Sequence, residues 1–440
     1  MVTLDRGMGL LQATATNIIG MVGVGPFLTI PFMVTAMGGP HIIYAWSFGA
    51  VLALCDGLVY AELGAALPGS GGPYVYLREA YRPFGLHRMM AFLFICQVML
   101  AVPLTVAGGA VGFADYLGFY WNTVTPLEHN LVAAAVCIGV TVLLYRDITS
   151  VGRLAVVMLA VVLATLGWVI VAGLMHFSWA QAFDFPPTAR RLDANLVRAV
   201  GAAGLLAMYN YGGYNNVCSI GDEIVDPERT IPRAIVLSIA VVVLLYVAMS
   251  TVILGMIPWQ EAQQTRTIAS LFIARTFSNP SSGHIAALVM TALILFVTVS
   301  SLYALVLSYS RVPFAAARDG QFFEAFARLH PSKHFPYVSL LTICAVTIPF
   351  CFFTLGQLVN WLIQVQILMQ FIWQCAAVML LRRYRPDVPK PFRMWLYPVP
   401  ALVSLALWIY VFVSGPAAGI IFSFAFLAGA VGAYVLFARG

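Results

Sequence analysis

The sequence predicts an all-α membrane protein with twelve transmembrane helices, arranged as a five-plus-five inverted repeat in which helices 1 and 6 are discontinuous. Three observations lead to this prediction. Hydrophobic residues make up 61% of the 440 residues, charged residues make up only 9%, and the mean hydropathy is +0.91. Long apolar runs occur along the whole chain, and two of them are interrupted near the middle by glycine-rich stretches. A water-soluble globule of this length would need far more polar surface.

Twelve apolar runs reach the length of roughly 20 residues that a helix needs to cross a hydrocarbon core about 30 Å thick. They begin near residues 10, 41, 88, 130, 151, 196, 234, 285, 337, 357, 396 and 416. The third and eighth runs are overlong, so we expect them to continue as interfacial or cytoplasmic helix. The first run exceeds twenty residues and lacks a small-residue cleavage site, which argues against a removable signal peptide. We therefore expect a multi-pass protein of a plasma or inner membrane.

Basic residues in the connections predict the orientation of the chain, because Lys and Arg favour the cytoplasmic side. When the twelve runs alternate across the bilayer, eighteen Lys and Arg residues fall on the side of the N terminus and five on the other side. Both termini are therefore expected to be cytoplasmic. This asymmetry also explains the net charge of +6, so that charge does not indicate a nucleic-acid partner.

The sequence indicates neither a metal site nor a cofactor. The seven cysteines lie nearly all inside apolar runs without paired metal spacing, which is typical of small apolar packing residues. The seven histidines are scattered, mostly at the ends of the runs. There is also no Ser-His-Asp set and no phosphate-binding loop, so the sequence argues against an enzyme.

The two interrupted runs divide the chain into two sets of five segments. Each set begins with an interrupted run and continues through four unbroken ones, and because five is odd the second set has inverted topology. We expect a first repeat in residues 1–176, a second repeat in residues 177–383, and helices 11 and 12 in residues 384–440. Inverted repeats of this kind place a solute site at their interface near the bilayer midplane and expose it to each side in turn. This layout predicts a secondary transporter that works by alternating access.

The first interruption, at residues 20–27, has the sequence Gly-Met-Val-Gly-Val-Gly-Pro-Phe. Unwound backbone survives in a bilayer only where it lines a cavity or is covered by protein, because unpaired N–H and C=O groups are costly in hydrocarbon. A half-helix that begins after Gly25 presents free N–H groups and a positive dipole end to a carboxylate. Pro26 suits a helix start but removes one donor. The alternative is close helix packing through small residues. The predicted substrate-binding residues of this stretch are Gly23, Val24, Gly25, Pro26 and Phe27.

The second interruption, at residues 209–216, has the sequence Tyr-Asn-Tyr-Gly-Gly-Tyr-Asn-Asn. Carbonyl groups left unpaired before either break suit an ammonium group or an alkali cation. The two breaks together would bind a zwitterion such as an amino acid, with Tyr209 as an aromatic gate. The alternative is aromatic packing with the tyrosine hydroxyls bonded to neighbouring helices. The predicted substrate-binding residues here are Tyr209, Asn210, Tyr211, Gly212 and Tyr214.

Two acidic residues of the second segment are candidates for coupling. Asp56 lies about eleven residues before the cytoplasmic end of its run, which at a rise of about 1.5 Å per residue is midway across the membrane. A carboxylate at this depth is a candidate proton carrier or counter-charge for an amine, with a hydrogen-bonded structural role as the alternative. Glu62 lies nearer the inside face, where it can share this role or belong to a cytoplasmic gate.

Further polar residues suggest a gate and a cation site. Asp222 and Glu223, with Arg229 or Arg311, lie at the membrane edge and predict a cytoplasmic gate, with plain structural ion pairs as the alternative. Ser300 and Ser301 of the eighth segment, together with Gly20, form a possible cation site between segments one and eight. The alternative is that these hydroxyls bond to their own helix.

Four motifs occur in order along the chain. They are Gly-Val-Gly-Pro-Phe at 23–27, Ala-Glu-Leu-Gly at 61–64 with Pro-Gly-Ser-Gly-Gly-Pro-Tyr-Val-Tyr at 68–76, Tyr-Gly-Gly-Tyr at 211–214 with Asp-Glu at 222–223 and Asp-Pro-Glu-Arg-Thr-Ile-Pro-Arg-Ala at 226–234, and Ser-Arg at 310–311 with Ala-Arg-Asp-Gly at 317–320. In these motifs the chain resembles the amino acid-polyamine-organocation (APC) transporter superfamily over nearly its whole length. The resemblance implies the five-plus-five inverted-repeat, LeuT-like fold and secondary transport of amino acids or related amines, coupled to H⁺ or Na⁺. It would place residues 23–26 near a substrate carboxylate and residues 209–211 at the amine and gating positions.

Some residues depart from the commoner pattern of that superfamily. It often has a small or hydroxylated residue where Val24 stands, an isoleucine where Pro26 stands and a small residue where Asn210 stands. Polyamine-importing relatives are similar to this chain in the Gly-Pro-Phe turn, in an acid at the place of Asp56 and in an asparagine at the place of Asn210. An amino acid permease is the first hypothesis, a transporter of polyamines or other organic cations is the second, and a membrane nutrient sensor is the non-transport alternative.

Overall fold

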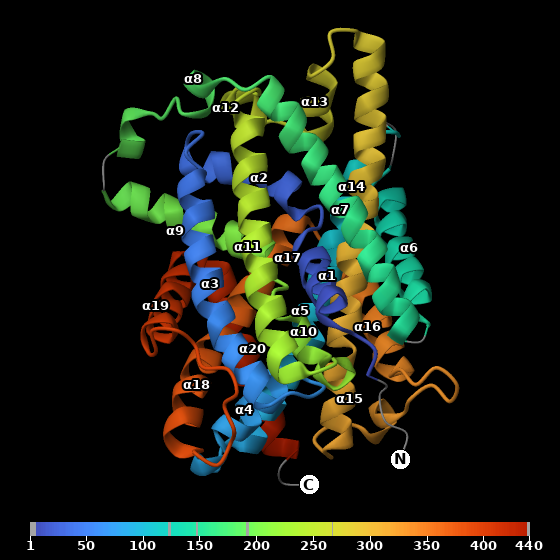
Figure 1. Ribbon diagram of the computed structural model, residues 1–440, viewed down its shortest axis with the longest axis vertical. Helices are drawn as coiled ribbons and strands as arrows, with labels where there is room; N and C mark the ends of the chain where they lie inside the picture. Colours follow the sequence, from blue (N-terminus) through green and yellow to red (C-terminus); the bar gives the residue numbers. More distant parts are fainter. Residues whose placement is uncertain (1–5, 122–124, 147, 191–192, 266, 438–440) are drawn as a thin grey trace.

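The computed structural model describes residues 6–121, 125–146, 148–190, 193–265 and 267–437. Arg191, Arg266 and Arg439, which entered the orientation prediction, lie outside these residues. Helices dominate the described chain, which contains no β-strand beyond two isolated bridges. The long helices run roughly along one axis of the molecule, and the described chain begins and ends at the same end of the bundle (Figure 1).

Eight helices of the described chain are long and apolar enough to cross a membrane. A bent pair, α1 (Leu10–Met21) and α2 (Gly25–Met37), passes the same test as one broken span with a bend of 43°. These helices make the chain a multi-pass membrane protein. The eight are α3 (Ile43–Ala66), α5 (His87–Leu117), α6 (Pro126–Leu144), α7 (Ile148–Met175), α11 (Pro227–Leu254), α14 (Pro280–Tyr309) with α15 (Arg311–Arg318), α17 (Leu355–Gln366) with α18 (Ile372–Tyr384), and α20 (Ala417–Phe437).

Three further helices coincide with predicted segments, but none of them meets both requirements for a membrane span, which are sufficient length and sufficient hydropathy. They are α9 (Ala194–Tyr211), α16 (Tyr337–Phe350) and α19 (Val399–Ser414). Twelve spans therefore stay a prediction. The overlong third and eighth runs form α5 with 31 residues and α14 with 30 residues, the second continued by α15.

Short helices cap and connect the long ones. They are α4 (Pro73–Ala80), α8 (Trp179–Ala182), α10 (Asn216–Ser219), α12 (Trp259–Ala262), α13 (Ile268–Arg275), the 3-10 turns Arg82–Phe84, Pro187–Arg190, Gly221–Glu223 and Glu324–Ala327, and a π-helical turn at Ile367–Phe371. Some of their boundaries have local causes. The Asp193 side chain accepts hydrogen bonds from the N–H groups of Asn195 and Leu196 and so caps α9. Gly38 at φ 67° ends α2 in the left-handed conformation.

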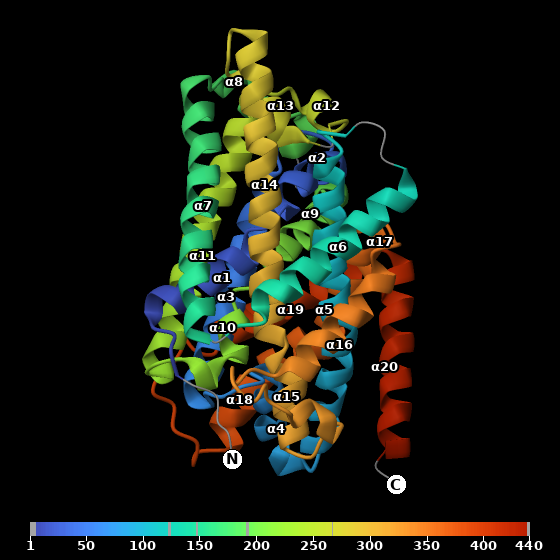
Figure 2. The same cartoon turned by 90° about the vertical axis from the view of Figure 1, so that its right-hand side faces the viewer.

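The core of the bundle surrounds α1. Every residue of α1 from Ala13 onward is buried, including Thr14, Thr16 and Asn17, so neighbouring helices enclose this helix on all sides. Helices α7, α11 and α14 pack around α1, and α3 packs along α11 on the far side. By contrast, α20 lies at the edge of the bundle (Figure 2), where only 17% of its apolar window is buried. The broken helix is thus central, and α20 presents most of its surface to lipid.

Candidate functional site

The two interrupted helices meet at their breaks. Residues 22–24 separate α1 from α2, and α9 ends at Tyr211 before a turn that contains Gly212 and Gly213. Gly213 has φ 115°, and a Cβ placed on it would lie 3.0 Å from the carbonyl carbon of Gly20. Only glycine allows this conformation and this approach of two backbones. Both predicted interruptions are therefore present and in contact. After α9, however, the chain continues only as the single turn α10 and a 3-10 turn before α11 begins.

Two side chains satisfy the backbone that the breaks release. Asn17 of α1 donates from Nδ2 to the carbonyl of Tyr214 at 2.7 Å and accepts at Oδ1 from the N–H of Val217 at 3.0 Å. The Tyr246 hydroxyl of α11 donates to the carbonyl of Met21 at 2.7 Å, and the carbonyl of Asn210 lies 3.4 Å from it. These bonds replace helix hydrogen bonds where no water is at hand. Neither Asn17 nor Tyr246 was among the residues predicted from the sequence, although a lone amide in an apolar run is a usable signal.

Replacement of Tyr246 with phenylalanine should destabilise the protein by about 1–3 kcal/mol, because a buried carbonyl of the first break loses its donor. The ring keeps its place between Trp46 and Tyr211, since those contacts do not use the hydroxyl. Thermal unfolding of the purified protein measures the change. Tyr44→Phe, whose ring packs on His41 and Phe185, is the matched control. Equal melting temperatures for the two variants would contradict this role of Tyr246.

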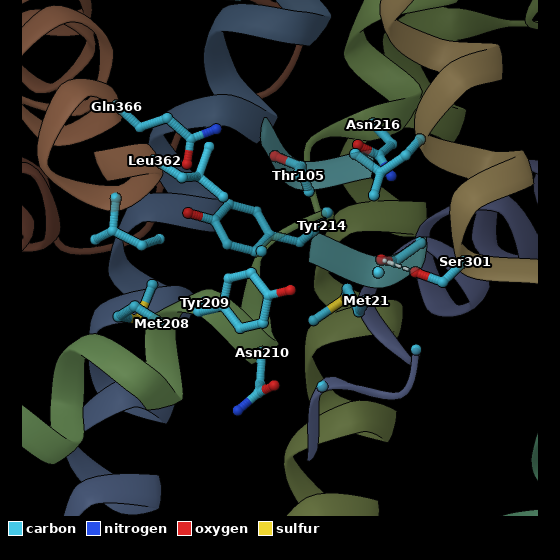
Figure 3. A pocket seen from close by; sticks show the side chains of 18 of the residues that line it. Met21, Thr105, Met208, Tyr209, Asn210, Tyr214, Asn216, Ser301, Leu362 and Gln366 are labelled. Carbon is cyan, nitrogen blue, oxygen red and sulfur yellow. Dashed lines mark hydrogen bonds between the residues drawn. The ribbon is translucent and has the colours of Figure 1, made fainter. Parts of the chain in front are cut away.

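A cavity with about 910 Å³ of empty space lies between the breaks (Figure 3). Its walls come from the two breaks, from the middle of α5, from α14 and from α17, together with Phe371 and Trp408. In Figure 3 the rings of Tyr214 and Tyr209 are drawn in the middle of the site, with Gln366 and Leu362 toward one side and Ser301 toward the other. The predicted site residues that line this cavity are Gly20, Gly23, Val24, Gly25, Tyr209, Asn210, Gly212, Tyr214 and Ser301.

Several polar groups of the cavity lack a partner within the described chain. The amide of Asn216 is fully buried with neither its oxygen nor its nitrogen hydrogen-bonded, and Oδ1 of Asn210 is also unpaired. The N–H groups of Gly23 and Val24 donate to no described residue. A Cβ on Gly25 would lie 2.5 Å from Oδ1 of Asn210, so the glycine leaves room for this oxygen. Buried polar groups are nearly always satisfied, so these are available to a ligand or to water.

The cavity is neutral. Its described lining contains no Asp, Glu, Lys, Arg or His. Apolar side chains such as Val102, Leu302, Leu362 and Ile363 alternate with a few hydroxyl and amide groups. A charged group inside this cavity would lose its hydration without gaining an opposite charge.

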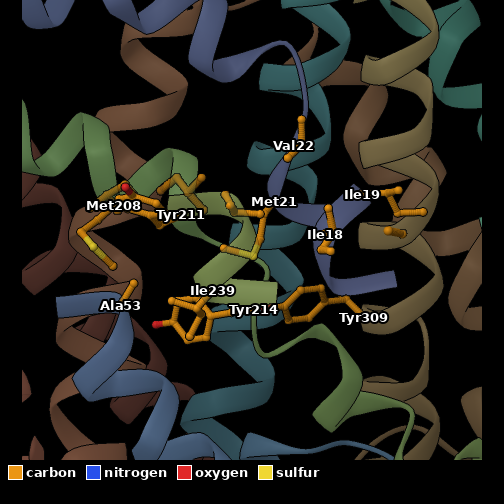
Figure 4. Close-up of a cluster of buried hydrophobic side chains, with 14 of the residues drawn as sticks. Ile18, Ile19, Met21, Val22, Ala53, Met208, Tyr211, Tyr214, Ile239 and Tyr309 are labelled. Carbon is orange, nitrogen blue, oxygen red and sulfur yellow. The ribbon is translucent and has the colours of Figure 1, made fainter. Parts of the chain in front are cut away.

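Three predicted substrate-binding residues lie outside this lining. Tyr211 is fully buried, its ring packs on Trp46 and Tyr246, and its hydroxyl donates to the Trp46 carbonyl at 3.3 Å. Figure 4 shows Tyr211 in an apolar cluster with Met21 and Met208. Pro26 and Phe27 are buried in the first turn of α2. Tyr211 thus makes aromatic packing contacts, and Pro26 lies at the start of the half-helix; their substrate-binding roles stay predictions.

Asp56 lies behind the cavity wall and not in it. The carboxylate is fully buried and accepts hydrogen bonds from the Tyr214 hydroxyl, from Oγ of Ser404 at 2.9 Å and from Nε1 of Trp408 at 3.0 Å. The Cys375 thiol points to the same carboxylate at 3.7 Å. Because Tyr214 and Trp408 do line the cavity, Asp56 orients two of its walls. Its coupling or counter-charge role stays a prediction.

Glu62 joins two distant parts of the chain. Arg382, at the end of α18, donates to both of its carboxylate oxygens, and the N–H of Met394 donates to Oε2 at 2.8 Å. The guanidinium of Arg382 also stacks 3.8 Å from the ring centre of Tyr397. Glu62 therefore fixes the linker between α18 and α19 to α3, and it does not line the cavity.

Two of the four predicted gate residues form a buried ion pair. Arg311 donates from Nε and Nη2 to the Glu223 carboxylate at 2.7 and 3.2 Å, and the two side chains are 6% and 1% exposed. The backbone carbonyl of Glu223 accepts from Gly7 and Met8, so the pair also ties the segment before α1. Asp222 and Arg229 form no ion pair with the described residues, and Arg229 is exposed.

The two serines of the possible cation site face different ways. Ser301 donates to the Gly20 carbonyl at 3.2 Å, directly at the first break. Ser300 donates to the Phe296 carbonyl of its own helix at 2.9 Å, which is the alternative that the sequence left open. Only Ser301 and Gly20 therefore meet at the cavity.

A polytopic helical bundle with a cavity between two broken helices is the architecture of a membrane transporter. The chain belongs to the amino acid permease family, because the model of that family matches residues 8–435. This match confirms the resemblance to the APC superfamily. Three relatives illustrate the family. The cystine/glutamate transporter of Homo sapiens is 28% identical over 413 residues, covering 92% of this chain and 79% of the relative.

The other two relatives have similar coverage. The branched-chain amino acid permease BcaP of Bacillus subtilis (strain 168) is 27% identical over 436 residues, covering 93% of this chain and 88% of the relative. The large neutral amino acids transporter small subunit 2 of Mus musculus is 26% identical over 423 residues, covering 94% of this chain and 76% of the relative. The chain is thus an amino acid permease by family and by the names of these relatives.

Proposed function

We propose that the permease moves neutral amino acids across its membrane as a secondary transporter, by alternating access. The observation that carries this proposal is the neutral lining of the cavity, together with the unpaired backbone N–H groups of Gly23 and Val24. The substrate carboxylate binds at these N–H groups, at the positive end of α2. The ammonium group binds at the break after α9, where carbonyls and Oδ1 of Asn210 accept hydrogen bonds.

The substrate side chain then lies between α5 and α17. Val102, Leu362 and Ile363 form apolar contacts with it, while Thr105 and Gln366 accommodate a polar end. A charged side chain would be buried there without a counter-charge, at a cost of several kcal/mol. The name of the relative BcaP, a branched-chain amino acid permease, agrees with this substrate class.

A polyamine fits this cavity less well. A diamine needs carboxylates or many carbonyls for both of its ammonium groups, and the nearest acid, Asp56, already accepts three hydrogen bonds from Tyr214, Ser404 and Trp408. The neutral zwitterion is therefore the preferred substrate.

The transport cycle follows from the proposed architecture of twelve spans with both termini in the cytoplasm. Residues 1–176 and 177–383 act as the two inverted repeats, and residues 384–440 add the last two helices. The repeats rock about the two breaks, and the Glu223–Arg311 pair closes the path on the side of the termini. The central position of α1 lets a small rotation of the broken helix open one side of the cavity as the other closes.

Uptake into proteoliposomes tests the substrate class. Radiolabelled leucine is the reporter, and unlabelled leucine, glutamine, glutamate, lysine and putrescine are competitors in tenfold excess. We expect leucine and glutamine to reduce uptake at least fivefold and the three charged compounds to leave it nearly unchanged. Competition by putrescine as strong as that by leucine would overturn the proposal. Uptake measurements with and without a sodium gradient, and with and without a pH gradient, identify the coupling ion.

A further inference from the structure

A groove with about 1070 Å³ of empty space lies on the surface of α11, outside the transport cavity. One wall is the first half of α11, and the other is the linker 385–398 that joins α18 to α19. The α11 wall presents Arg229, Arg233, Val236 and Ala240, and the linker presents Phe392 and Trp395.

The α11 wall changes from charged to apolar along the helix. Positions 229, 233, 236 and 240 recur at the spacing of one helical face. Arg233 and Ala240 are separated by about 10 Å along the axis, at a rise of about 1.5 Å per residue. Because α11 spans the membrane, its first turns lie at the headgroup level and the later turns lie in the acyl region. This order matches a phospholipid, whose charged head continues into an apolar tail.

The two arginines have no ionic partner in the described protein. Both are exposed and neither forms an ion pair with a described residue, whereas Arg311 and Arg382 are paired with buried carboxylates. Arg229 also lies in the first turn of α11, where the helix dipole disfavours a cation. Glu228 is the single acid of the groove, so the lining keeps a net positive charge. An anionic group between the two guanidinium groups would relieve both effects.

The linker wall suits the membrane interface. Trp395 is 60% exposed and belongs to the residue type that concentrates at headgroup level. The next residue before it, Met394, is bonded through its N–H to Glu62 of α3, which fixes this wall in place. The groove therefore has one fixed aromatic wall and one helical wall that changes from basic to apolar.

We propose that this groove binds an anionic phospholipid, with its phosphate between Arg229 and Arg233 and an acyl chain along Val236 and Ala240 against Phe392 and Trp395. The bound lipid joins α11 to the linker 385–398 and so stabilises the α3–α11 pair that packs beside the transport site. The lipid would come from the membrane leaflet that lies on the same side as the two chain termini, and the permease would bind it as a specific ligand.

Lipid binding to the purified full-length protein in detergent tests this proposal. Dioleoyl phosphatidylglycerol and dioleoyl phosphatidylcholine are titrated separately, and bound lipid is counted by native mass spectrometry. We expect the wild type to bind phosphatidylglycerol at least tenfold more tightly than phosphatidylcholine. Arg229→Gln with Arg233→Gln should remove this preference. Both residues are exposed, so the variant should fold, and each single variant should show an intermediate loss.

Matched controls separate this site from general charge attraction. Arg328→Gln with Arg383→Gln removes two exposed cations that do not line the groove, and it should keep the tenfold preference. Trp395→Ala should weaken phosphatidylglycerol binding severalfold, and glycerol 3-phosphate without acyl chains should not compete. The proposal is wrong if the wild type shows no preference, if the control double variant loses it equally, or if glycerol 3-phosphate competes as well as the lipid.

Discussion

Replacing Gly213 with alanine is expected to reduce amino acid uptake at least a hundredfold. The residue has φ 115°, which L residues rarely adopt, and a Cβ there would lie 3.0 Å from the carbonyl carbon of Gly20 and 3.1 Å from the nitrogen of Met21. Neither contact is with a flexible side chain, so the two breaks must move apart. The neighbouring backbone would have to give by a few tenths of an ångström, and residue 213 would be strained at its positive φ. The unpaired N–H groups of Gly23 and Val24 would then lose their position relative to the break after α9, and binding groups that are out of place lower the rate steeply.

Uptake of radiolabelled leucine into proteoliposomes measures this loss. Size-exclusion chromatography in detergent checks that the variant is inserted and folded. Gly139→Ala is the matched control, because a Cβ at Gly139 of α6 meets no atom within 4 Å. The control should transport at nearly the wild-type rate. Wild-type uptake by Gly213→Ala would show that the two backbones need not touch.

Replacing Glu223 with glutamine is expected to destabilise the protein by about 3–5 kcal/mol, because it leaves the buried Arg311 guanidinium without a counter-charge. Arg311 keeps its bonds to the Leu307 carbonyl at 3.0 Å and to Oγ of Ser310 at 2.9 Å, but these are neutral acceptors. Removing both charges, as in Glu223→Gln with Arg311→Met, should recover part of the loss. Thermal unfolding of the purified variants measures each change.

An exposed ion pair provides the control for this prediction. Glu261 and Arg275 form a two-bond pair whose side chains are 38% and 41% exposed. Glu261→Gln should therefore cost no more than about 1 kcal/mol. If Glu223→Gln and Glu261→Gln lower the melting temperature equally, the buried Glu223–Arg311 pair contributes no more to stability than the exposed pair.

The sequence predicted the helices and both breaks well, for a simple reason. Hydropathy reports the length of an apolar run, and glycines with a proline in such a run have few structural uses other than a break. The half-helix after the first break begins at Gly25 with Pro26 next, as expected. What the sequence did not indicate is that α9 is followed only by the short turn α10 and a 3-10 turn, because the mixed apolar and polar residues 217–223 are compatible with either helix or turn.

The direction in which individual side chains point was harder to predict. Tyr209 and Tyr211 are two positions apart, so on a helix their side chains point in nearly opposite directions, and only Tyr209 reaches the cavity. The depth of Asp56 in the membrane could be counted along its helix. The count does not show which way the carboxylate points, and in the structure it points away from the cavity, toward Tyr214, Ser404 and Trp408. Packing in three dimensions decides this question.

Long-range partners were beyond the reach of sequence reasoning. Glu62 was a candidate for the gate, yet its partner Arg382 lies 320 positions away along the chain. Asn17 and Tyr246 brace the breaks from separate helices, and a lone polar residue in an apolar run does not reveal which carbonyl it meets. Of the predicted gate set, the sequence could not distinguish the buried Arg311 from the exposed Arg229.

A cryo-electron microscopy map of the permease with bound leucine would test most directly whether the two helix breaks form the substrate site. We expect density for the amino acid in the cavity between the breaks, with its carboxylate at the N–H groups of Gly23 and Val24 and its side chain toward Val102 and Leu362. Density for leucine at another place, or a continuous helix from α1 into α2 with no cavity beside it, would contradict this account.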